Sequence, residues 1–263
     1  MNITQVAIQL YTLREHCKTA ADLAETCKKV RAIGYEAVQA SGVGPIPEEE
    51  IAKIIKDAGL ILCATHENGQ KILDETDAII ERMNKLGCKL TAYPYPAGVD
   101  FTSRESIDTT IKKLDAAGAK MRAAGITLGY HNHGIEFARV PGTNQTFFEY
   151  VFANTNPENL VAEPDTYWVQ YGGADPVVWA KKLAGRLPFI HLKDYTFNAD
   201  PKENKPMFCE IGAGNLDFKA IIAAAEAGGC QWFIVEQDTT PGCPFDSVKQ
   251  SFDYIKANLV SQE

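Results

Sequence analysis

The chain has 263 residues, of which 45% are hydrophobic, and its 34 acidic and 26 basic side chains give a net charge of −8. This length suits one α/β barrel or two small domains, each with a large hydrophobic core. Nucleic acid and anionic membranes are poor partners for an acidic chain without a basic cluster, because both attract positive charge.

The opening residues and the cysteines favour a cytoplasmic protein. The stretch MNITQVAIQLYTLREH has no basic segment followed by an apolar run and a small-residue cleavage site, and no run of eighteen apolar residues occurs anywhere. The seven cysteines are scattered and have no CxxC spacing, which argues against a disulfide framework and a thiolate zinc site.

Eight apolar, β-favouring runs follow one another along the chain. In chain order they are VAIQLYTL (6–13), YEAVQA (35–40), LILCAT (60–65), CKLTAY (88–93), ITLGYH (126–131), NLVAEPD (159–165), LPFIHLKD (187–194) and CQWFIV (230–235). A glycine in the position that ends a helix precedes five of these runs, and these glycines are Gly34, Gly59, Gly87, Gly125 and Gly229.

The stretches between the runs have apolar residues three and four apart, as in 21–33, 72–86 and 107–121, which predicts amphipathic helices. Strands that alternate with helices, without a flexible linker, favour a single-domain (β/α)8 TIM barrel over residues 1–263. A doubly wound open sheet is the alternative. The first strand and helix junction lacks a GxGxxG motif, which weakens the dinucleotide-binding version of that alternative.

Polar residues close most of the later strands. The clusters are ATHE (64–67), YHNH (130–133), EPD (163–165), HLKD (191–194) and VEQD (235–238). Reactive side chains of a (β/α)8 barrel lie at the C-terminal ends of its strands, and residues two apart on a strand share a face. These side chains are therefore expected to converge at one rim of the barrel.

Such a convergence predicts a site for one divalent metal ion. Asp165, His191 and Glu236 close three successive strands, and His131 closes the strand before them. Nitrogen and oxygen ligands without a thiolate suit Mn²⁺, Mg²⁺, Co²⁺ or a catalytic Zn²⁺. A lone histidine at a strand end is often only hydrogen-bonded, and His131 has a second interpretation as a substrate-binding residue.

Four further residues are candidates for substrate binding: His66, His133, Trp168 and Lys193. Lys193 can bind a substrate hydroxyl, pair with Asp194 or, less simply, form a Schiff base. Trp168 can offer a flat face to a sugar ring, although core packing explains it equally well.

Residues elsewhere at the rim have weaker support. Tyr11 and Arg14 can reach the mouth from the first strand, and Glu210 in the loop after the seventh strand can either act there or cap local backbone amides. The glycines at 212–214 are a weak candidate for a phosphate cradle, because no basic residue stands beside them.

With these residues assembled, the chain resembles the sugar phosphate isomerase/epimerase superfamily. These are xylose-isomerase-like barrels that include inosose dehydratase, tagatose 3-epimerase and 3-keto-glycoside lyases. The resemblance spans nearly the whole chain and rests on IQLYTLR (8–14), GYHNHGIEF (129–137), PDTYWV (164–169), IHLKD (190–194), GAGNLDF (212–218) and VEQD (235–238).

The resemblance implies one divalent ion held by glutamate, aspartate, histidine and glutamate from strands five to eight. Asp165, His191 and Glu236 match the last three of these ligands, whereas His131 stands where the family's epimerases carry glutamate. The fourth ligand therefore stays open.

The resemblance also implies an acid/base pair from strands five and eight, here His131 and Glu236. An imidazole of near-neutral pKa can protonate a leaving oxygen while a carboxylate removes the proton α to a carbonyl. This asymmetry favours a lyase or dehydratase that acts on a keto-sugar or keto-cyclitol. Isomerisation or epimerisation by the same first step is the alternative.

Two other classes share the fold. An apurinic endonuclease uses three zinc ions and a basic groove, which this acidic chain lacks. A non-catalytic sugar-binding barrel would keep the pocket without turnover. A free sugar, cyclitol or glycoside is the favoured small-molecule partner, and the family's dimers and tetramers make a homo-oligomer compatible with the sequence.

Overall fold

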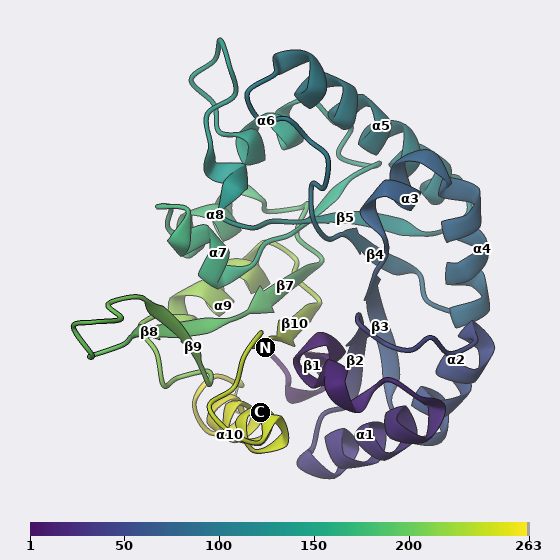
Figure 1. The fold of residues 1–263 in the computed structure, drawn as a ribbon, viewed down its shortest axis with the longest axis vertical. Helices are drawn as coiled ribbons and strands as arrows, with labels where there is room; N and C mark the ends of the chain where they lie inside the picture. The colour runs from purple at the N-terminus through teal and green to yellow at the C-terminus, as the bar shows by residue number, and fades with distance from the viewer. Residues whose placement is uncertain (262–263) are drawn as a thin grey trace.

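Eight parallel strands form the centre of the computed structural model, which describes residues 1–261 (Figure 1). Their order is β6-β5-β4-β3-β2-β1-β10-β7. The strands are β1 (Val6–Gln9), β2 (Ala37–Ala40), β3 (Ile61–His66), β4 (Leu90–Tyr93), β5 (Thr127–His131), β6 (Val161–Glu163), β7 (Phe189–Leu192) and β10 (Trp232–Val235). Each strand lies within one of the predicted apolar runs, except that β3 extends one residue beyond its run.

The end strands β6 and β7 approach each other and nearly close the barrel. The His191 amide donates to the Pro164 carbonyl at 2.9 Å, and Asp165 and His191 form an isolated parallel bridge. The predicted (β/α)8 barrel is confirmed, and the open-sheet alternative is excluded. Whether one domain spans 1–263 stays a prediction, because residues 262–263 lie outside the described part.

Helices surround the strands on the outside of the barrel (Figure 1). They are α1 (Ala20–Ile33), α2 (Glu48–Asp57), α3 (Gly69–Asp74), α4 (Thr76–Leu86), α5 (Arg104–Ala123), α6 (Phe147–Ala153), α7 (Thr166–Tyr171), α8 (Pro176–Lys182), α9 (Phe218–Ala227) and α10 (Pro244–Asn258), with 3-10 turns at Ile3–Gln5, Leu10–His16 and Ile135–Phe137. Within residues 1–261, every helix is too short or too polar to cross a membrane.

Local sequence signals set the helix ends. Thr19 begins α1 through a capping box, in which its side chain accepts from the Asp22 amide at 3.2 Å. The five glycines predicted to follow helices have positive φ values between 67° and 126°. At Gly34 a Cβ atom would also lie 2.5 Å from the Phe252 ring, so this turn accepts only glycine without rearrangement.

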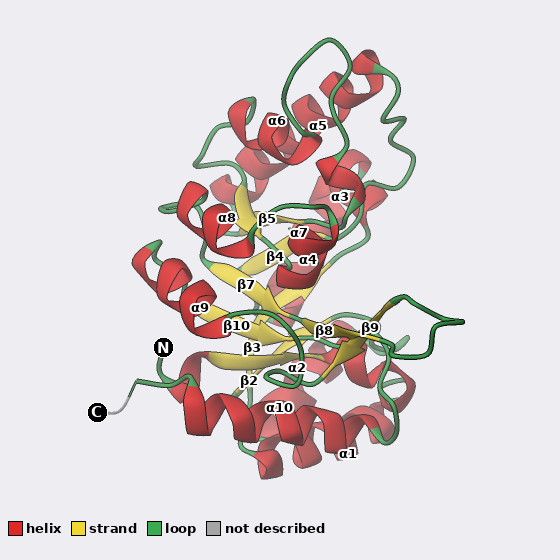
Figure 2. Cartoon of the chain, turned by 90° about the vertical axis from the view of Figure 1, so that its left-hand side faces the viewer, coloured by secondary structure: helices red, strands yellow, loops and turns green. Residues whose placement is uncertain are grey.

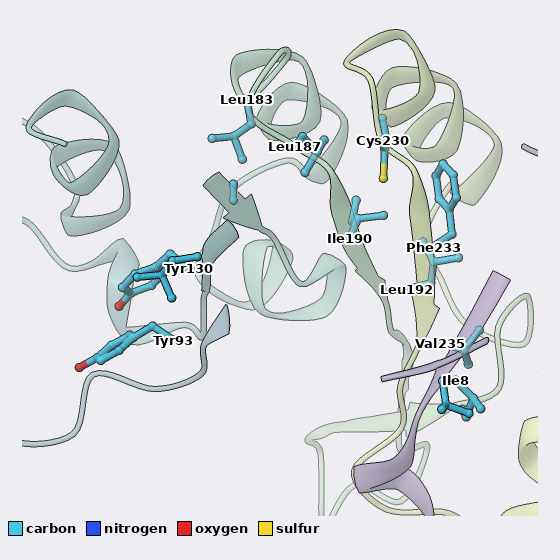
Figure 3. Close-up of a cluster of buried hydrophobic side chains, with 14 of the residues drawn as sticks. Ile8, Tyr93, Tyr130, Leu183, Leu187, Ile190, Leu192, Cys230, Phe233 and Val235 are labelled. Carbon is cyan, nitrogen blue, oxygen red and sulfur yellow. The ribbon is translucent and has the colours of Figure 1, made fainter. Parts of the chain in front are cut away.

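The core has two layers that are divided by the strands. Large apolar side chains fill the space between strands and helices, and Figure 3 shows Tyr130, Ile190 and Leu192 among them. A small second cluster fills the inside of the barrel, and its members are Ala7, Ala37, Cys63, Ala64, Ala92, Phe189 and Ile234.

Strand alternation places the polar residues above this inner cluster. On β7, Phe189 belongs to the inner cluster, so His191 two residues later points inward as well. On β5, a Cβ atom at Gly129 would lie 2.5 Å from the Phe189 ring, which shows that this position also faces the interior. His131 follows Gly129 by two residues and therefore enters the same space.

A short antiparallel hairpin occupies the region after β7, where the sequence predicted only a long loop. It consists of β8 (Asp194–Phe197) and β9 (Pro206–Cys209). Figure 2 shows the hairpin standing away from the barrel wall. The strands have four residues each, so their alternation is too brief to mark them in the sequence.

Candidate active site

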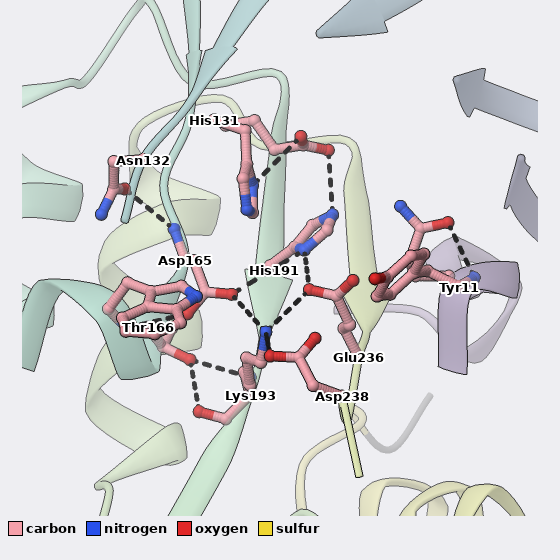
Figure 4. Close-up of polar contacts among 12 residues, drawn as sticks. Tyr11, His131, Asn132, Asp165, Thr166, His191, Lys193, Glu236 and Asp238 are labelled. Atoms are coloured by element: carbon pink, nitrogen blue, oxygen red, sulfur yellow. Dashed lines mark hydrogen bonds and ion pairs between the residues drawn. The ribbon is translucent and has the colours of Figure 1, made fainter. Parts of the chain in front are cut away.

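Four polar side chains converge inside the C-terminal rim of the barrel. His131, Asp165, His191 and Glu236 are all buried, and each offers one donor atom within 4.8 Å of those of the other three. His191 Nδ1 lies 3.0 Å from Glu236 Oε2 and 3.9 Å from Asp165 Oδ2 (Figure 4). The residues proposed from the sequence as metal ligands are therefore close enough to bind one ion together.

Asp165 is held by its backbone and by one of its two carboxylate oxygens. Its amide donates to Asn132 Oδ1 at 3.1 Å, and its Oδ1 accepts from the Trp168 amide at 2.9 Å as the N-cap of α7. Its Oδ2 atom is buried without a hydrogen-bond partner among the described residues, and Lys193 Nζ is 3.6 Å away. A buried, unpartnered carboxylate oxygen is unfavourable unless a cation meets it.

His131 has a similar unpartnered atom. Its Nδ1 is buried and makes no hydrogen bond within residues 1–261, with Glu163 Oε2 at 3.4 Å. The cluster therefore contains buried polar atoms without hydrogen-bond partners among residues 1–261, and its imidazole and carboxylate groups are ligands of the kind that Mn²⁺, Mg²⁺, Co²⁺ and Zn²⁺ accept. The donor set thus fits a divalent ion.

Lys193 brings positive charge to the same rim. Its ammonium lies 2.8 Å from Asp238 Oδ2 and 3.1 Å from Glu236 Oε2, although its side chain is only 2% exposed. Thr166 fixes the backbone beneath it, because the Thr166 hydroxyl accepts from the Lys193 amide and donates to its carbonyl, both at 2.9 Å. The suggested pairing of Lys193 with Asp194 is wrong, because Lys193 forms ion pairs with Asp165, Glu236 and Asp238 instead.

Asp194 instead forms hydrogen bonds with the glycine-containing loop that follows β9. Its carboxylate accepts from the backbone amides of Gly212 and Gly214 at 3.0 Å and from that of Leu216 at 3.3 Å. These amides are the groups that a phosphate would need. The weak prediction of a phosphate cradle at 212–214 is therefore wrong, because an internal carboxylate already occupies it. Glu210 nearby accepts from the Ser247 hydroxyl at 2.6 Å.

Burial and neighbouring charges set the protonation of the cluster. Burial, helped by His191, lowers the pKa of His131 well below its usual value, so the imidazole is neutral rather than near its titration point. Burial alone would lower the pKa of His191, but Glu163 and Glu236 raise it to about 10. Burial raises the pKa of Asp165 to about 7 despite Lys193. Burial works against ionisation of Glu236 too, yet Lys193 and His191 hold its pKa well below the usual range.

A cavity of about 540 Å³ opens beside the cluster. It is lined by Tyr11, Arg14, Ser41, His66, Pro94, Tyr95, His131, His133, Lys193, Glu236, Asp238 and Thr239. This size is in the range of pockets that enclose small molecules. The sequence placed Tyr11 and Arg14 at this mouth, and both do line it.

Three of the four residues predicted to bind substrate line this cavity: His66, His133 and Lys193. His66 also reaches inward, where its Nε2 is 2.5 Å from Glu163 Oε2. Trp168 is not among the described residues that line the cavity, and its ring lies behind His133, 5.2 Å away between centroids. The indole Nε1 of Trp168 and the Nδ1 of His133 are buried without partners in the described chain.

Two residues to which the sequence assigned no role lie beneath the cluster. Glu163 and Gln39 are fully buried and hydrogen-bonded to each other, with Gln39 Nε2 donating to Glu163 Oε1 at 2.6 Å. Alternation gave a signal for Glu163, which lies two residues before Asp165 on the same face. For Gln39 the only signal in the sequence is that it is the one polar residue among the four residues of β2.

The fold and this site define a (β/α)8 barrel with a buried cluster of imidazoles and carboxylates, able to bind a divalent ion, at its C-terminal rim. Residues 27–258 match the family model described as xylose isomerase-like TIM barrel. The chain belongs to this family.

Curated relatives of the chain include inosose dehydratases. The protein from Mesomycoplasma hyopneumoniae strain 7448 is 27% identical over 181 residues, which cover 60% of this chain and 56% of the relative. The protein from Clostridium beijerinckii is 22% identical over 205 residues, which cover 73% and 66%. The chain thus spans less than two thirds of the length of either relative.

Solved structures share the fold over almost the whole chain. Two sugar phosphate isomerase/epimerases from Parabacteroides distasonis superpose with TM-scores of 0.82 and 0.79 at 22% and 25% identity, covering 98% and 97% of this chain and 96% and 98% of theirs. A xylose isomerase-like TIM barrel protein from Mycobacterium smegmatis, in complex with magnesium, has a TM-score of 0.69 at 16% identity and covers 95% of each chain.

Proposed function

We propose that this protein is a divalent-metal-dependent enzyme that removes the proton α to the carbonyl of a keto-sugar or keto-cyclitol and then eliminates a β-oxygen. The observation that carries the proposal is the convergence of His131, Asp165, His191 and Glu236 beside a cavity, where two of them have buried polar atoms without a hydrogen-bond partner within residues 1–261. The similarity to inosose dehydratases supports elimination as the outcome.

The four clustered residues are the proposed ligands of the ion. When bound there, a divalent ion draws electron density from the carbonyl and adjacent hydroxyl of the substrate and so acidifies the α carbon. Mn²⁺, Mg²⁺, Co²⁺ and Zn²⁺ all suit this nitrogen and oxygen donor set.

Glu236 is the proposed base. Its carboxylate lines the cavity, and the Lys193 ammonium 3.1 Å away helps to keep it ionised. An ionised carboxylate at the cavity wall can accept the α proton as the carbon–hydrogen bond breaks. The electron pair then moves onto the carbonyl oxygen, where the Lys193 ammonium can stabilise the developing negative charge.

His131 is the proposed partner in proton transfer. Its strand β5 is separated from β10 by β6 and β7, so it approaches the substrate from a different part of the rim than Glu236. Its neutral imidazole can accept a proton from solvent and deliver that proton to the departing β-oxygen, and the α proton held by Glu236 returns to solvent after product release. The carbon–oxygen bond then breaks, and one water molecule leaves.

Substrate orientation is assigned to residues of the cavity wall and of the layer behind it. His66, His133 and Lys193 offer polar atoms to substrate hydroxyls at three places around the cavity. Trp168 lies behind His133 and is proposed to orient that ring, in addition to any contact that it makes with a sugar itself.

Isomerisation or epimerisation is the second candidate outcome, and the similarity to structures of sugar phosphate isomerase/epimerases favours it. It shares the first proton transfer, after which the intermediate is reprotonated instead of losing the β-oxygen. Product analysis separates the two outcomes, since elimination lowers the mass of the substrate by one water and reprotonation leaves it unchanged.

The test begins with elemental analysis of the purified protein. Activity is then measured before and after chelation on a panel of 3-keto sugars, inososes and common ketoses. We expect a bound divalent ion, loss of activity on chelation and recovery when Mn²⁺ is restored. Absence of any divalent ion, or full turnover by the Glu236→Gln variant, contradicts the scheme.

Solvent deuterium separates an enzyme from a sugar-binding barrel. An enzyme of the proposed kind introduces deuterium at the α carbon of a keto-sugar, because proton removal precedes either outcome. Tight binding of a keto-sugar without any exchange would support the non-catalytic class instead.

A further inference from the structure

Glu163 is a fully buried carboxylate that lies directly beneath the proposed ion site. Three histidines surround it, with His66 Nε2 at 2.5 Å, His191 Nε2 at 3.1 Å and His131 Nδ1 at 3.4 Å. Gln39 Nε2 donates to it at 2.6 Å. These groups come from four different strands, so Glu163 connects the walls of the barrel.

The two nitrogens of His191 face different neighbours. Nδ1 faces the proposed ion site, 3.0 Å from Glu236 Oε2. Nε2 faces inward, 2.6 Å from Gln39 Oε1 and 3.1 Å from Glu163 Oε1. A histidine that binds an ion through one nitrogen commonly donates its other N–H to a carboxylate or carbonyl oxygen, which fixes the tautomer.

The direction of the hydrogen bonds follows from Glu163. An ionised carboxylate only accepts, so the group of Gln39 that faces it must be the amide NH₂. The Gln39 carbonyl then faces His191 and also accepts from Gln9 Nε2 at 2.8 Å. Because this oxygen cannot donate, Nε2 of His191 must carry a proton. Nδ1 faces the Glu236 carboxylate and donates to it in this structure, so an ion that binds here displaces the proton of Nδ1 and takes up its lone pair.

Glu163 could instead be a ligand itself, since His66, His131, Glu163 and His191 also place one donor atom each within 4.8 Å of one another. The hydrogen bonds argue against this alternative. Both oxygens of Glu163 already have partners, Gln39 on Oε1 and His66 on Oε2. In the described part of the chain, the carboxylate oxygen that lacks a hydrogen bond belongs to Asp165, in the other group.

We infer that Glu163 is a positioning residue that acts through Gln39 to hold the proton of His191 on Nε2 and to present Nδ1 to the ion. The inference rests on the ion site of the proposed function. It adds a residue that touches neither substrate nor ion, and a role for the buried polar layer formed by Gln9, Gln39 and Glu163.

The first test is the affinity for Mn²⁺ alone, measured by titration calorimetry. The Glu163→Gln variant removes the carboxylate that can only accept hydrogen bonds, so the side-chain amide of Gln39 can flip by 180°. We therefore expect the dissociation constant for Mn²⁺ to rise about 10- to 100-fold. Glu163→Asp, which keeps the acceptor, should recover part of this loss. Glu210→Gln is the control, because it replaces another buried carboxylate that bonds Ser247 and belongs to neither group of candidate ligands, and it should leave the dissociation constant unchanged.

The second test needs no variant and so does not depend on the folding of one. Nitrogen-15 NMR of the histidines in the Zn²⁺-loaded wild-type protein reports which nitrogen of His191 carries hydrogen. We expect the hydrogen on Nε2 and the ion on Nδ1. The opposite assignment overturns the inference.

The remaining outcomes separate this inference from the proposed function. If the wild-type protein binds neither Mn²⁺ nor Zn²⁺, both fail. If it binds Mn²⁺ and Glu163→Gln binds equally well, only the role of Glu163 fails. A crystal structure of the Mn²⁺ form with anomalous density bonded to Glu163 would make this residue a ligand and overturn its positioning role.

Discussion

Asp194 and Gly214 lie so close together that only glycine fits at position 214. The Gly214 amide donates to Asp194 Oδ2 at 3.0 Å, and a Cβ atom at 214 would lie 2.2 Å from Asp194 Oδ1 and 2.4 Å from the Tyr195 carbonyl. The contact ties the loop after β9 to the strand that follows Lys193.

A Gly214→Ala variant should therefore be less stable. Overpacking against a carboxylate and a backbone oxygen is expected to lower the free energy of unfolding by about 1–3 kcal/mol, measured by urea denaturation. Gly242→Ala is the matched control, since, apart from Gly242 and its two chain neighbours, no atom of residues 1–261 lies within 4 Å of its Cβ position and no effect is expected. Equal stability of the two variants would show that the loop relaxes freely.

The parts of this molecule that could be predicted are those set by local pattern. The strands follow from apolar runs, and strand ends in a parallel barrel must meet at one rim, so His131, Asp165, His191 and Glu236 could be grouped without coordinates. Their convergence within 4.8 Å agrees with that prediction. Their roles as ligands and catalysts stay predictions.

The parts that could not be predicted depend on contacts between distant segments. Glu163 and Gln39 are 124 residues apart, and nothing local shows that they bond beneath the site. Asp194 lies next to Lys193 in sequence, which suggested a pair, but Lys193 forms its ion pairs with other carboxylates, and the loop at 212–216 supplies the partners of Asp194. Proximity in sequence did not predict either set of partners.

Ion binding should stabilise the folded protein through Asp165. Excess Mn²⁺ is expected to raise the melting temperature of the wild-type protein and EDTA to reverse this, because an ion at 100 times its dissociation constant adds about 2.7 kcal/mol of stability. Asp165→Asn should fold, since asparagine also caps a helix, but should lose most of the shift. Differential scanning calorimetry measures both.

Asp217→Asn provides the control for that comparison. Asp217 caps α9 by accepting from the Ala220 amide at 3.1 Å, and it is not part of either group of candidate ligands. Its variant should keep the full Mn²⁺ shift. If the Asp165→Asn variant also keeps the full Mn²⁺ shift, the ion does not bind at the Asp165 carboxylate.

His131→Gln should impair proton transfer more than binding. Loss of a positioned acid/base group commonly lowers turnover about 10²- to 10⁴-fold, and glutamine keeps polar atoms without a titratable nitrogen. The measurement is the rate of product formation by the Mn²⁺-loaded variant on the best keto-substrate. His16→Gln is the control, because the His16 ring packs against Phe245, with 5.0 Å between centroids, and does not line the 540 Å³ cavity. An unchanged rate for His131→Gln would remove His131 from the proposed pair.

Glu136 should make stability depend on pH. It is fully buried, it accepts from the His133 amide at 2.9 Å and from the Tyr130 hydroxyl at 3.1 Å, and burial raises its pKa from 4.5 to about 7. The folded state therefore holds a proton that the unfolded state releases between pH 4.5 and 7. The resulting stability is fully present below pH 4.5 and is lost as the pH rises through 7, by about 3 kcal/mol in all.

Glu136→Gln should remove this slope. The glutamine oxygen can accept from the His133 amide while its NH₂ donates to the Tyr130 hydroxyl, so both contacts persist without a titrating group. Urea denaturation from pH 4.5 to 8 should show the variant gaining stability relative to wild type as the pH rises. Glu105→Gln, on the exposed surface of α5, should follow the wild-type curve. Parallel curves of stability against pH for the wild type and Glu136→Gln would mean that the buried Glu136 stays ionised in this pH range. The hydrogen bonds that it accepts would then stabilise its charge.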